Sequence, residues 1–144
     1  CNLKHSQGHA MKTLIAEDDF TSRLLLQGLL KGYGACHVAV NGKEAVDAVR
    51  IALEAGEPYD LICLDIMMPE MTGQEALQMI REHEECLGIL STRGSKIIMT
   101  TALCDIKNVR NAFYNLCDGY LTKPIQKEML IIELIKIGLI SNKV

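Results

Sequence analysis

Short apolar runs alternate with segments of helical periodicity along most of this sequence. The expected strands are residues 11–16, 36–40, 61–65, 96–100 and 119–122, and the expected helices are residues 20–31, 42–55, 74–90, 105–117 and 125–138. Apolar runs of this length, bounded by turn residues, are typical of strands that are buried on both faces. Strands that alternate with helices form parallel sheets with right-handed crossovers and helices on both sides. The sequence therefore predicts a doubly wound α/β domain with a five-stranded parallel sheet.

Composition limits the classes of protein that fit this pattern. The chain has 144 residues, of which 49% are hydrophobic, and a net charge of −3. No apolar run approaches the roughly 18 residues that a membrane span needs, and no basic stripe predicts direct binding to nucleic acid. Six cysteines without a CxxC pair argue against a zinc site and against a disulfide framework. We therefore expect a cytoplasmic protein with reduced thiols and no contact with a membrane.

The first ten residues show neither helical nor strand periodicity. They are polar and do not resemble a secretory signal. We interpret residues 1–10 as a tail, or as a remnant that precedes a natural start at Met11. The expected domain covers residues 11–144, because the four residues after Ile140 leave no room for another one.

The third expected strand ends at a single carboxylate, Asp65, and a turn segment with Pro69 and Gly73 follows it. In open parallel sheets, ligands and chemistry collect at the carboxyl ends of the strands. The alternative is that Asp65 only caps the helix that begins near Gln74. Asp65 lies too far upstream of that helix for the usual cap position, so we favour a functional carboxylate.

The ends of four expected strands supply one candidate site, made of Glu17, Asp18, Asp65, Thr101 and Lys123. Clustered carboxylates suit Mg²⁺, which takes oxygen ligands and often bridges carboxylates to a phosphate. A carboxylate can also attack phosphorus and form an acyl phosphate, while a cation, a lysine and a hydroxyl neutralise the transferred group. Without a cation the carboxylates repel one another, so we expect the metal-free site to be strained and sensitive to pH.

Four motifs occur in order and at compatible spacing: LIAEDD, LDIMMPEMTG, MTTA and GYLTKP. With them the chain resembles a receiver domain of the bacterial response-regulator family, of the stand-alone, chemotaxis-regulator type, from Met11 to about Ile140. The resemblance implies a flavodoxin-like fold with strand order 2-1-3-4-5. It also implies a phosphorylation-dependent switch of a two-component system that is not a conventional enzyme but has intrinsic self-phosphorylation and self-dephosphorylation activity.

The same resemblance assigns roles to individual residues. Asp65 would be the phosphoacceptor, and Thr101 and Lys123 would bind phosphoryl oxygens. For Mg²⁺ it implies Asp18 and Asp65 as ligands, a water-mediated contact from Glu17, and the backbone carbonyl of Met67. The peptide bond between Lys123 and Pro124 would be cis, a minority state that a fold must stabilise.

The resemblance further implies a conformational switch. Thr101 would move toward the phosphoryl group and Tyr120 would rotate inward, which changes the surface formed by the fourth helix, the fifth strand and the fifth helix. The alternative is that Tyr120 is an ordinary half-buried strand tyrosine with its hydroxyl at the surface. The implied partners are a histidine kinase or phosphotransfer protein upstream and a target protein downstream.

Apolar residues recur at helical spacing in the expected helices, and the last helix has more of them than one stripe requires. Helix 20–31 shows helical spacing of Leu24, Leu25 and Leu29, and helix 74–90 is expected to turn Leu87 inward. In the last helix the stripe is assigned as Ile125, Leu130, Leu134 and Ile137, which leaves Ile131, Ile132 and Ile135 surplus. These three either pack on neighbouring helices or form an exposed patch for a partner or for a homodimer through the fourth and fifth helices.

Two apolar residues depart from the commonest pattern of the family, Met67 and Leu103. Both would flank the phosphoryl group and exclude water, so we expect slow self-dephosphorylation.

Two other interpretations compete with a stand-alone switch. The chain can be a receiver module excised from a larger hybrid kinase or transcription regulator. A magnesium-dependent phosphatase or phosphotransferase is disfavoured, because its nucleophile would follow the first strand in a DxD pattern.

Overall fold

The sheet has the predicted topology. The computed structural model describes residues 10–90, 92–102, 106–108 and 116–141. Its five strands are all parallel, in the order β2-β1-β3-β4-β5. The strands are β1 (Thr13–Ala16), β2 (Cys36–Ala39), β3 (Leu61–Asp65), β4 (Lys96–Ala102) and β5 (Gly119–Lys123). The doubly wound, flavodoxin-like fold is therefore confirmed, with strand bounds that differ by up to two residues from those expected.

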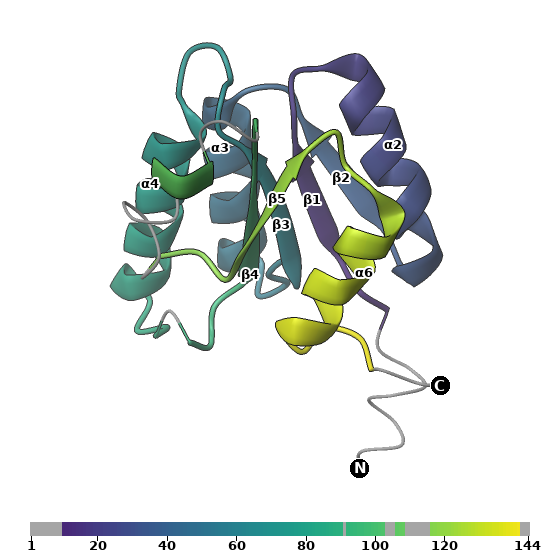
Figure 1. Ribbon diagram of the computed structural model, residues 1–144. Helices are drawn as coiled ribbons and strands as arrows, with labels where there is room; N and C mark the ends of the chain where they lie inside the picture. The colour runs from purple at the N-terminus through teal and green to yellow at the C-terminus, as the bar shows by residue number, and fades with distance from the viewer. Residues whose placement is uncertain (1–9, 91, 103–105, 109–115, 142–144) are drawn as a thin grey trace.

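Helices cover both faces of this sheet, as Figure 1 shows. They are α2 (Phe20–Leu30), followed by the 3-10 turn η1 (Lys31–Tyr33), then α3 (Gly42–Glu54), α4 (Gly73–Cys86) and α6 (Lys127–Lys136). The helices α3 and α4 lie on one side of the sheet, and α2 and α6 on the other (Figure 1). None of the helices in the described residues has the length and apolar character that a bilayer span requires.

The pleat of the strands divides the core into two clusters. Successive strand side chains point to opposite faces, so Ile62 and Leu64 pack with α3 and α4, whereas Leu61 and Cys63 pack with α2 and α6. All of these side chains are at most 1% exposed. The strong apolar character of β3 therefore follows from its place in the middle of the sheet.

Capping residues fix the beginnings of α2 and α4, the helices that follow the carboxyl ends of β1 and β3. Asp19 accepts a hydrogen bond from the backbone N–H of Ser22 at the start of α2. Thr72 and Glu75 form a capping box at the start of α4. Such caps satisfy backbone donors that have no partner inside the helix, and they hold the loops before α2 and α4 in place.

Three expectations about the helices were wrong. α4 ends at Cys86 rather than near residue 90, because the chain turns at Gly88, whose φ is 77°. Leu87 is consequently 57% exposed instead of facing inward. In α2 the fully buried leucines are Leu26 and Leu30, whereas Leu24 and Leu25 are exposed.

The fourth expected helix, 105–117, lies largely outside the described residues. Residues 106–108 are helical. Leu103, which was expected to flank the phosphoryl group, also lies outside them.

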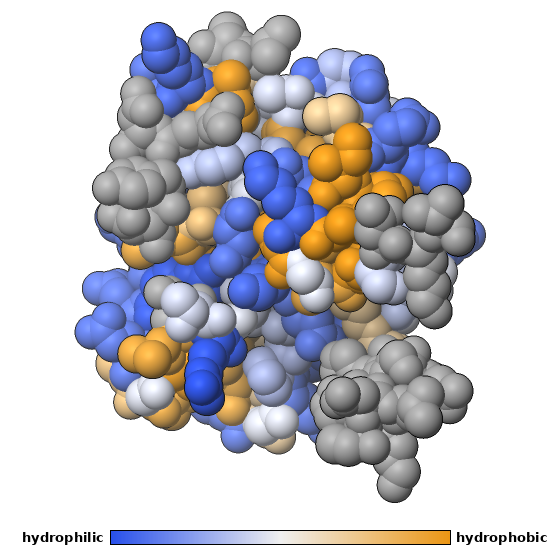
Figure 2. Space-filling view, turned by 60° about the horizontal axis from the view of Figure 1, so that its bottom comes forward, coloured by the Kyte–Doolittle hydropathy of each residue, from blue (hydrophilic) through white to orange (hydrophobic). Residues whose placement is uncertain are grey.

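The assigned stripe of the last helix is confirmed, and part of the surplus is exposed. Leu130 and Leu134 are fully buried, and Ile125 and Ile137 pack in the same cluster. Of the three surplus isoleucines, Ile132 is 53% exposed, whereas Ile131 and Ile135 are partly buried. Figure 2 shows apolar residues gathered over α6.

Candidate functional site

The parallel topology brings the ends of four strands together. Ala16 of β1 pairs with Leu64 of β3, so Glu17 and Asp65, each one residue further on, end up side by side at one edge of the sheet. Asp65 in turn pairs with Thr100 of β4. On β5, Lys123 pairs with Ala102, directly after Thr101. All five predicted residues therefore lie along the carboxyl edge of the sheet.

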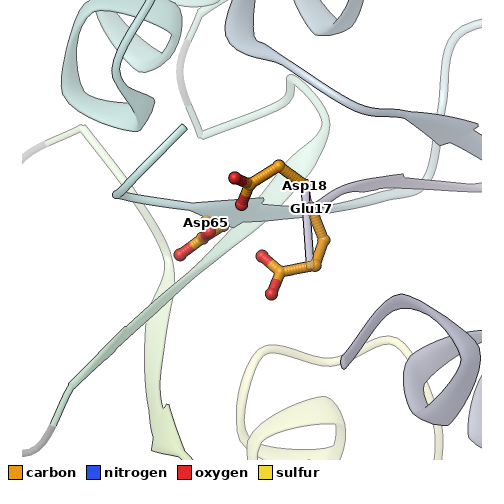
Figure 3. Close-up of side chains that lie close together, drawn as sticks. All are labelled: Glu17, Asp18 and Asp65. Carbon is orange, nitrogen blue, oxygen red and sulfur yellow. The ribbon is translucent and has the colours of Figure 1, made fainter. Parts of the chain in front are cut away.

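Three carboxylates converge at this edge. One oxygen each of Glu17, Asp18 and Asp65 lies within 4.8 Å of the others, and Figure 3 shows the three side chains directed toward a common space. Glu17 and Asp65 are buried and Asp18 is exposed. Oε2 of Glu17 is buried and has no hydrogen-bond partner within the residues that the structure describes. A buried carboxylate oxygen without a partner is costly, and an all-oxygen donor set fits Mg²⁺.

Lys123 provides the positive charge of the site. Its Nζ lies 2.7 Å from Oε1 of Glu17 and 3.1 Å from Oδ1 of Asp65. Burial alone would lower the pKa of Lys123, but the bonds to Glu17 and Asp65 outweigh it and raise that pKa above its usual value. Lys123 therefore stays protonated. The peptide bond from Lys123 to Pro124 is cis, as the family resemblance implied.

Glu17 holds a proton more tightly than an ordinary glutamate. The pKa of Glu17 is raised from 4.5 to about 7, first by burial and then by the hydrogen bond and charge of Asp65, while Lys123 acts in the opposite direction. Around neutral pH, part of the population therefore carries a proton on this carboxyl. This agrees with the expectation of a metal-free site that is sensitive to pH.

The loop after β3 is held close to Asp65 by backbone contacts. The N–H of Met67 lies 3.4 Å from Oδ1 of Asp65, and the N–H of Gly73 donates to the carbonyl of Ile66 at 2.9 Å. A Cβ on Gly73 would collide with the carbonyl of Asp65, so this position accepts only glycine without a shift of the loop. Glu70 has a φ of 66°, which is unfavourable for a residue with a side chain.

The side chain of Met67 is 74% exposed. Its backbone N–H is near Asp65, but the expectation that its side chain flanks the phosphoryl group stays a prediction. Tyr120 is half-buried on β5, where it pairs with Met99 of β4. Thr101 is 4% exposed at the end of β4. The roles of Thr101 and Tyr120 as a switch, and of the Met67 carbonyl as a ligand, stay predictions.

Arg23 is a part of the site that sequence reasoning missed. Its Nη1 donates to the carbonyl of Glu17 at 3.0 Å and reaches that of Asp18 at 3.5 Å. The guanidinium also lies over the ring of Phe20, 5.5 Å from its centroid. Arg23 thus ties α2 to the acidic loop. Glu17 lies before the start of α2 and Arg23 lies within it. No sequence motif predicts a hydrogen bond between a loop carbonyl and an arginine six residues later.

Comparison with known proteins gives a consistent result. Residues 13–135 match the family model of the response regulator receiver domain. The osmosensing histidine protein kinase SLN1 of Saccharomyces cerevisiae is 30% identical over 123 residues, which are 84% of this chain but 10% of that protein. The transcriptional regulatory protein CitT of Halalkalibacterium halodurans is 32% identical over 119 residues, 83% of this chain and 48% of CitT. The chain thus spans only a small part of the hybrid-kinase relatives that it matches.

Solved structures agree with the fold. One is the co-crystal structure of the Saccharomyces cerevisiae histidine phosphotransfer signaling protein Ypd1 and the receiver domain of its downstream response regulator Ssk1. It matches with a TM-score of 0.75 and 29% identity, over 93% of this chain and 92% of that one. The CheX-CheY-BeF3-Mg complex from Borrelia burgdorferi matches with a TM-score of 0.74 and 24% identity, over 92% of each chain, which bears on the fold alone.

Proposed function

Because this chain belongs to the response regulator receiver domain family of two-component signalling, we propose that it accepts a phosphoryl group on Asp65. The observation that carries the proposal is the convergence of three carboxylates within 4.8 Å, with Nζ of Lys123 3.1 Å from Asp65. Glu17, Asp18 and Asp65 would hold Mg²⁺, together with the carbonyl of Met67. The ion would supply positive charge at the transferred group.

Phosphoryl transfer is catalysed mainly by positioning the reacting groups and by neutralising the charge of the transferred phosphoryl group. A carboxylate oxygen of Asp65 attacks the phosphorus of a phosphohistidine on the donor. The new O–P bond makes an acyl phosphate while the N–P bond to the imidazole breaks, and the released imidazole nitrogen takes a proton from solvent. Lys123 faces the added negative charge, and the hydroxyl of Thr101 donates to a phosphoryl oxygen.

The donor is proposed to be a histidine kinase or a phosphotransfer protein. The solved complex of a receiver domain with a histidine phosphotransfer protein supports the second choice. The hybrid-kinase relatives support the alternative that this chain is a receiver module of a larger protein. In each of these cases Asp65 accepts the phosphoryl group by the same chemistry. One experiment on Asp65 therefore tests the shared phosphoacceptor function.

Intact mass after incubation with acetyl phosphate tests this function. Wild type should gain one phosphoryl group when Mg²⁺ is present and none in EDTA, and Asp65→Ala should gain none. Asp47→Ala is the matched control, because Asp47 lies on the outer surface of α3. An equal gain in Asp65→Ala and wild type would contradict the proposal.

The downstream step is proposed to run through Thr101 and Tyr120. Phosphorylation adds about −1.5 to −2 charge, which attracts the hydroxyl of Thr101 and vacates space that the ring of Tyr120 can enter. The surface over β5 and α6 then changes. The exposed Ile132 on α6 supports a role for this surface in contact with a target protein or in a homodimer.

Replacing Met67 with asparagine should accelerate loss of the phosphoryl group about tenfold, because a polar side chain at the mouth of the site can orient the water that an exposed thioether excludes. The measurement is the decay of phosphorylated protein by intact mass after removal of the phosphodonor. Met79→Asn, a change at an exposed methionine of α4, should leave the rate unchanged. An unchanged rate in Met67→Asn would reject water exclusion by this side chain.

A further inference from the structure

Arg23 makes contacts at the acidic loop that the proposed chemistry does not use. Its Nη1 donates to the backbone carbonyl of Glu17 at 3.0 Å and reaches that of Asp18 at 3.5 Å. Its own backbone N–H donates to the carbonyl of Asp19 at 2.9 Å. A single residue of α2 therefore holds three successive carbonyl groups directly after β1.

The two carbonyls that the guanidinium contacts belong to the peptide units on either side of the Cα of Asp18. A backbone has only two soft dihedral angles per residue. Restraining both peptide units therefore restrains φ and ψ of Asp18, and with them the direction of the bond from its Cα to its Cβ. The guanidinium of Arg23 thus governs where the Asp18 side chain points without contacting the carboxylate.

Asp18 depends on its backbone more than the other two carboxylates of the cluster do. Oε1 of Glu17 and Oδ1 of Asp65 contact Nζ of Lys123, at 2.7 Å and 3.1 Å. The side chain of Asp18 is exposed and makes no hydrogen bond or ion pair with the part of the chain that the structure describes. One of its oxygens nevertheless lies within 4.8 Å of an oxygen of each of the other two (Figure 3). The backbone that Arg23 restrains therefore sets its place in the cluster.

The guanidinium of Arg23 is itself held in place. It lies over the ring of Phe20, 5.5 Å from the ring centroid, which is within the range for attraction between a cation and an aromatic ring. Among the described residues, no carboxylate forms an ion pair with it. If Arg23 acted on the cluster through its charge alone, it would disfavour Mg²⁺, because both are positive.

We propose that Arg23 is a positioning residue of the carboxylate site, which restrains the backbone on both sides of Asp18 and so presents its carboxylate to Mg²⁺. This role rests on the proposed function, which places Mg²⁺ at the carboxylate cluster. Residues that orient metal ligands without touching the metal affect metal affinity about 10–100-fold. Because Arg23 acts through the backbone of a single ligand, we expect the lower end of this range.

Titration of the metal-free, ¹⁵N-labelled protein with MgCl₂ measures this role. The shifts of backbone amides near Asp65 give the dissociation constant without any phosphodonor. Arg23→Met keeps most of the length of the side chain and removes its donors and its charge. We expect it to bind Mg²⁺ about tenfold more weakly than wild type, whereas loss of a nearby positive charge by itself would tighten binding. The sign of the change therefore distinguishes positioning from electrostatics.

Three further variants make the result specific. Arg23→Lys keeps a charged donor at the same position and should recover part of the affinity. Lys31→Met removes one positive charge at the opposite end of α2 and should leave the affinity unchanged. Phe20→Leu removes the ring beneath the guanidinium and should weaken binding about two- to fivefold.

A double-mutant cycle locates the effect at Asp18. Asp18→Asn removes a proposed ligand and should weaken Mg²⁺ binding by itself. In the Asp18→Asn background, Arg23→Met should cost much less than about tenfold, because changes that remove the same interaction are not additive. Urea unfolding establishes that each variant is fully folded during the titration, so a general loss of stability cannot produce this pattern.

Several results would overturn the role of Arg23. They are equal or tighter Mg²⁺ binding in Arg23→Met than in wild type, no recovery in Arg23→Lys, an undiminished loss in the Asp18→Asn background, and a wild type that binds no Mg²⁺. Acetyl phosphate treatment of the same samples tests the proposed function by itself. A chain that is phosphorylated but whose Mg²⁺ affinity ignores Arg23 loses only the positioning role. A chain whose Mg²⁺ affinity depends on Arg23 but that gains no phosphoryl group loses only the phosphoacceptor function.

Discussion

Replacing Arg81 with methionine is expected to lower the free energy of unfolding by about 3–5 kcal/mol, the cost of breaking a buried ion pair by removal of one partner. Arg81 is 7% exposed and Glu84 is 1% exposed. The two form an ion pair of 2.7 Å within α4. Methionine fills most of the space of the arginine but leaves the Glu84 charge without its cation.

The guanidinium of Arg81 also links segments that are distant in sequence. Nε donates to the carbonyl of Leu116 at 2.7 Å, Nη1 to the carbonyl of Ser95 at 2.9 Å, and Nη2 to Asp118 at 3.0 Å. These contacts tie the beginnings of β4 and β5 to α4. Because an ammonium has no such fork of donors, Arg81→Lys should recover only part of the lost stability.

Urea unfolding followed by circular dichroism measures the effect. The matched control is Arg50→Met, since Arg50 makes exposed ion pairs with Asp47 and Glu54 on α3, and exposed pairs contribute about 0–1 kcal/mol. The double variant Arg81→Met with Glu84→Leu should be more stable than the single one, because it removes the stranded charge as well. A loss below about 1 kcal/mol in Arg81→Met would contradict a structural role for the pair.

The architecture was predictable because it rests on patterns that are local in sequence. A buried strand such as β3 is apolar at successive positions, and its end is marked by Asp65 and the turn after it. The carboxylate cluster was predictable as well, because topology alone brings the ends of parallel strands together. Neither inference needs the orientation of a particular side chain.

The buried face of a helix was harder to predict where apolar residues occur on several of its faces. α2 contains the run Leu24–Leu26 and the pair Leu29 and Leu30, so several stripes fit the sequence almost equally well. Only packing against β1 decides that Leu26 and Leu30 face the sheet.

The buried charges could not be predicted from the sequence. Arg81 and Glu84 occur in a segment so rich in charge that its pattern indicates an outer helix end. Their burial depends on partners at Ser95 and Asp118, which are 14 and 37 residues from Arg81. The raised pKa of Glu17 likewise depends on burial and on Asp65. The sequence spacing of these residues does not predict the size of that shift.

The second large effect concerns Glu17. In the absence of metal, the free energy of unfolding should fall as the pH rises from about 5 to about 8. The pKa of Glu17 is raised from 4.5 to about 7 in the folded protein. Between these two values the folded state binds more protons than the unfolded state, so a rise in pH favours unfolding. With about 1.4 kcal/mol for each pKa unit, the loss amounts to roughly 2–3 kcal/mol at most.

Substitution and metal should each remove this dependence. Glu17→Gln has no proton to lose, so its stability in EDTA should vary little over the same range, apart from the contributions of other groups. Glu82→Gln, at an exposed acid of α4, is the matched control and should keep the wild-type profile. Mg²⁺ competes with the proton for the same carboxylate, so it should stabilise wild type more at about pH 7.5 than at about pH 5.5.

Thermal unfolding at several pH values, with EDTA or with Mg²⁺, checks both expectations. A wild-type profile in EDTA that rises steadily from about pH 5 to about pH 8 would contradict the raised pKa of Glu17. Equal stabilisation by Mg²⁺ at both ends of the range would mean that the ion binds without displacing this proton. If instead the effect of Mg²⁺ grows with pH in wild type and not in Glu17→Gln, then occupation of the site by metal depends on ionisation of Glu17. Phosphorylation of Asp65 should then show the same rise with pH, because it depends on the ion.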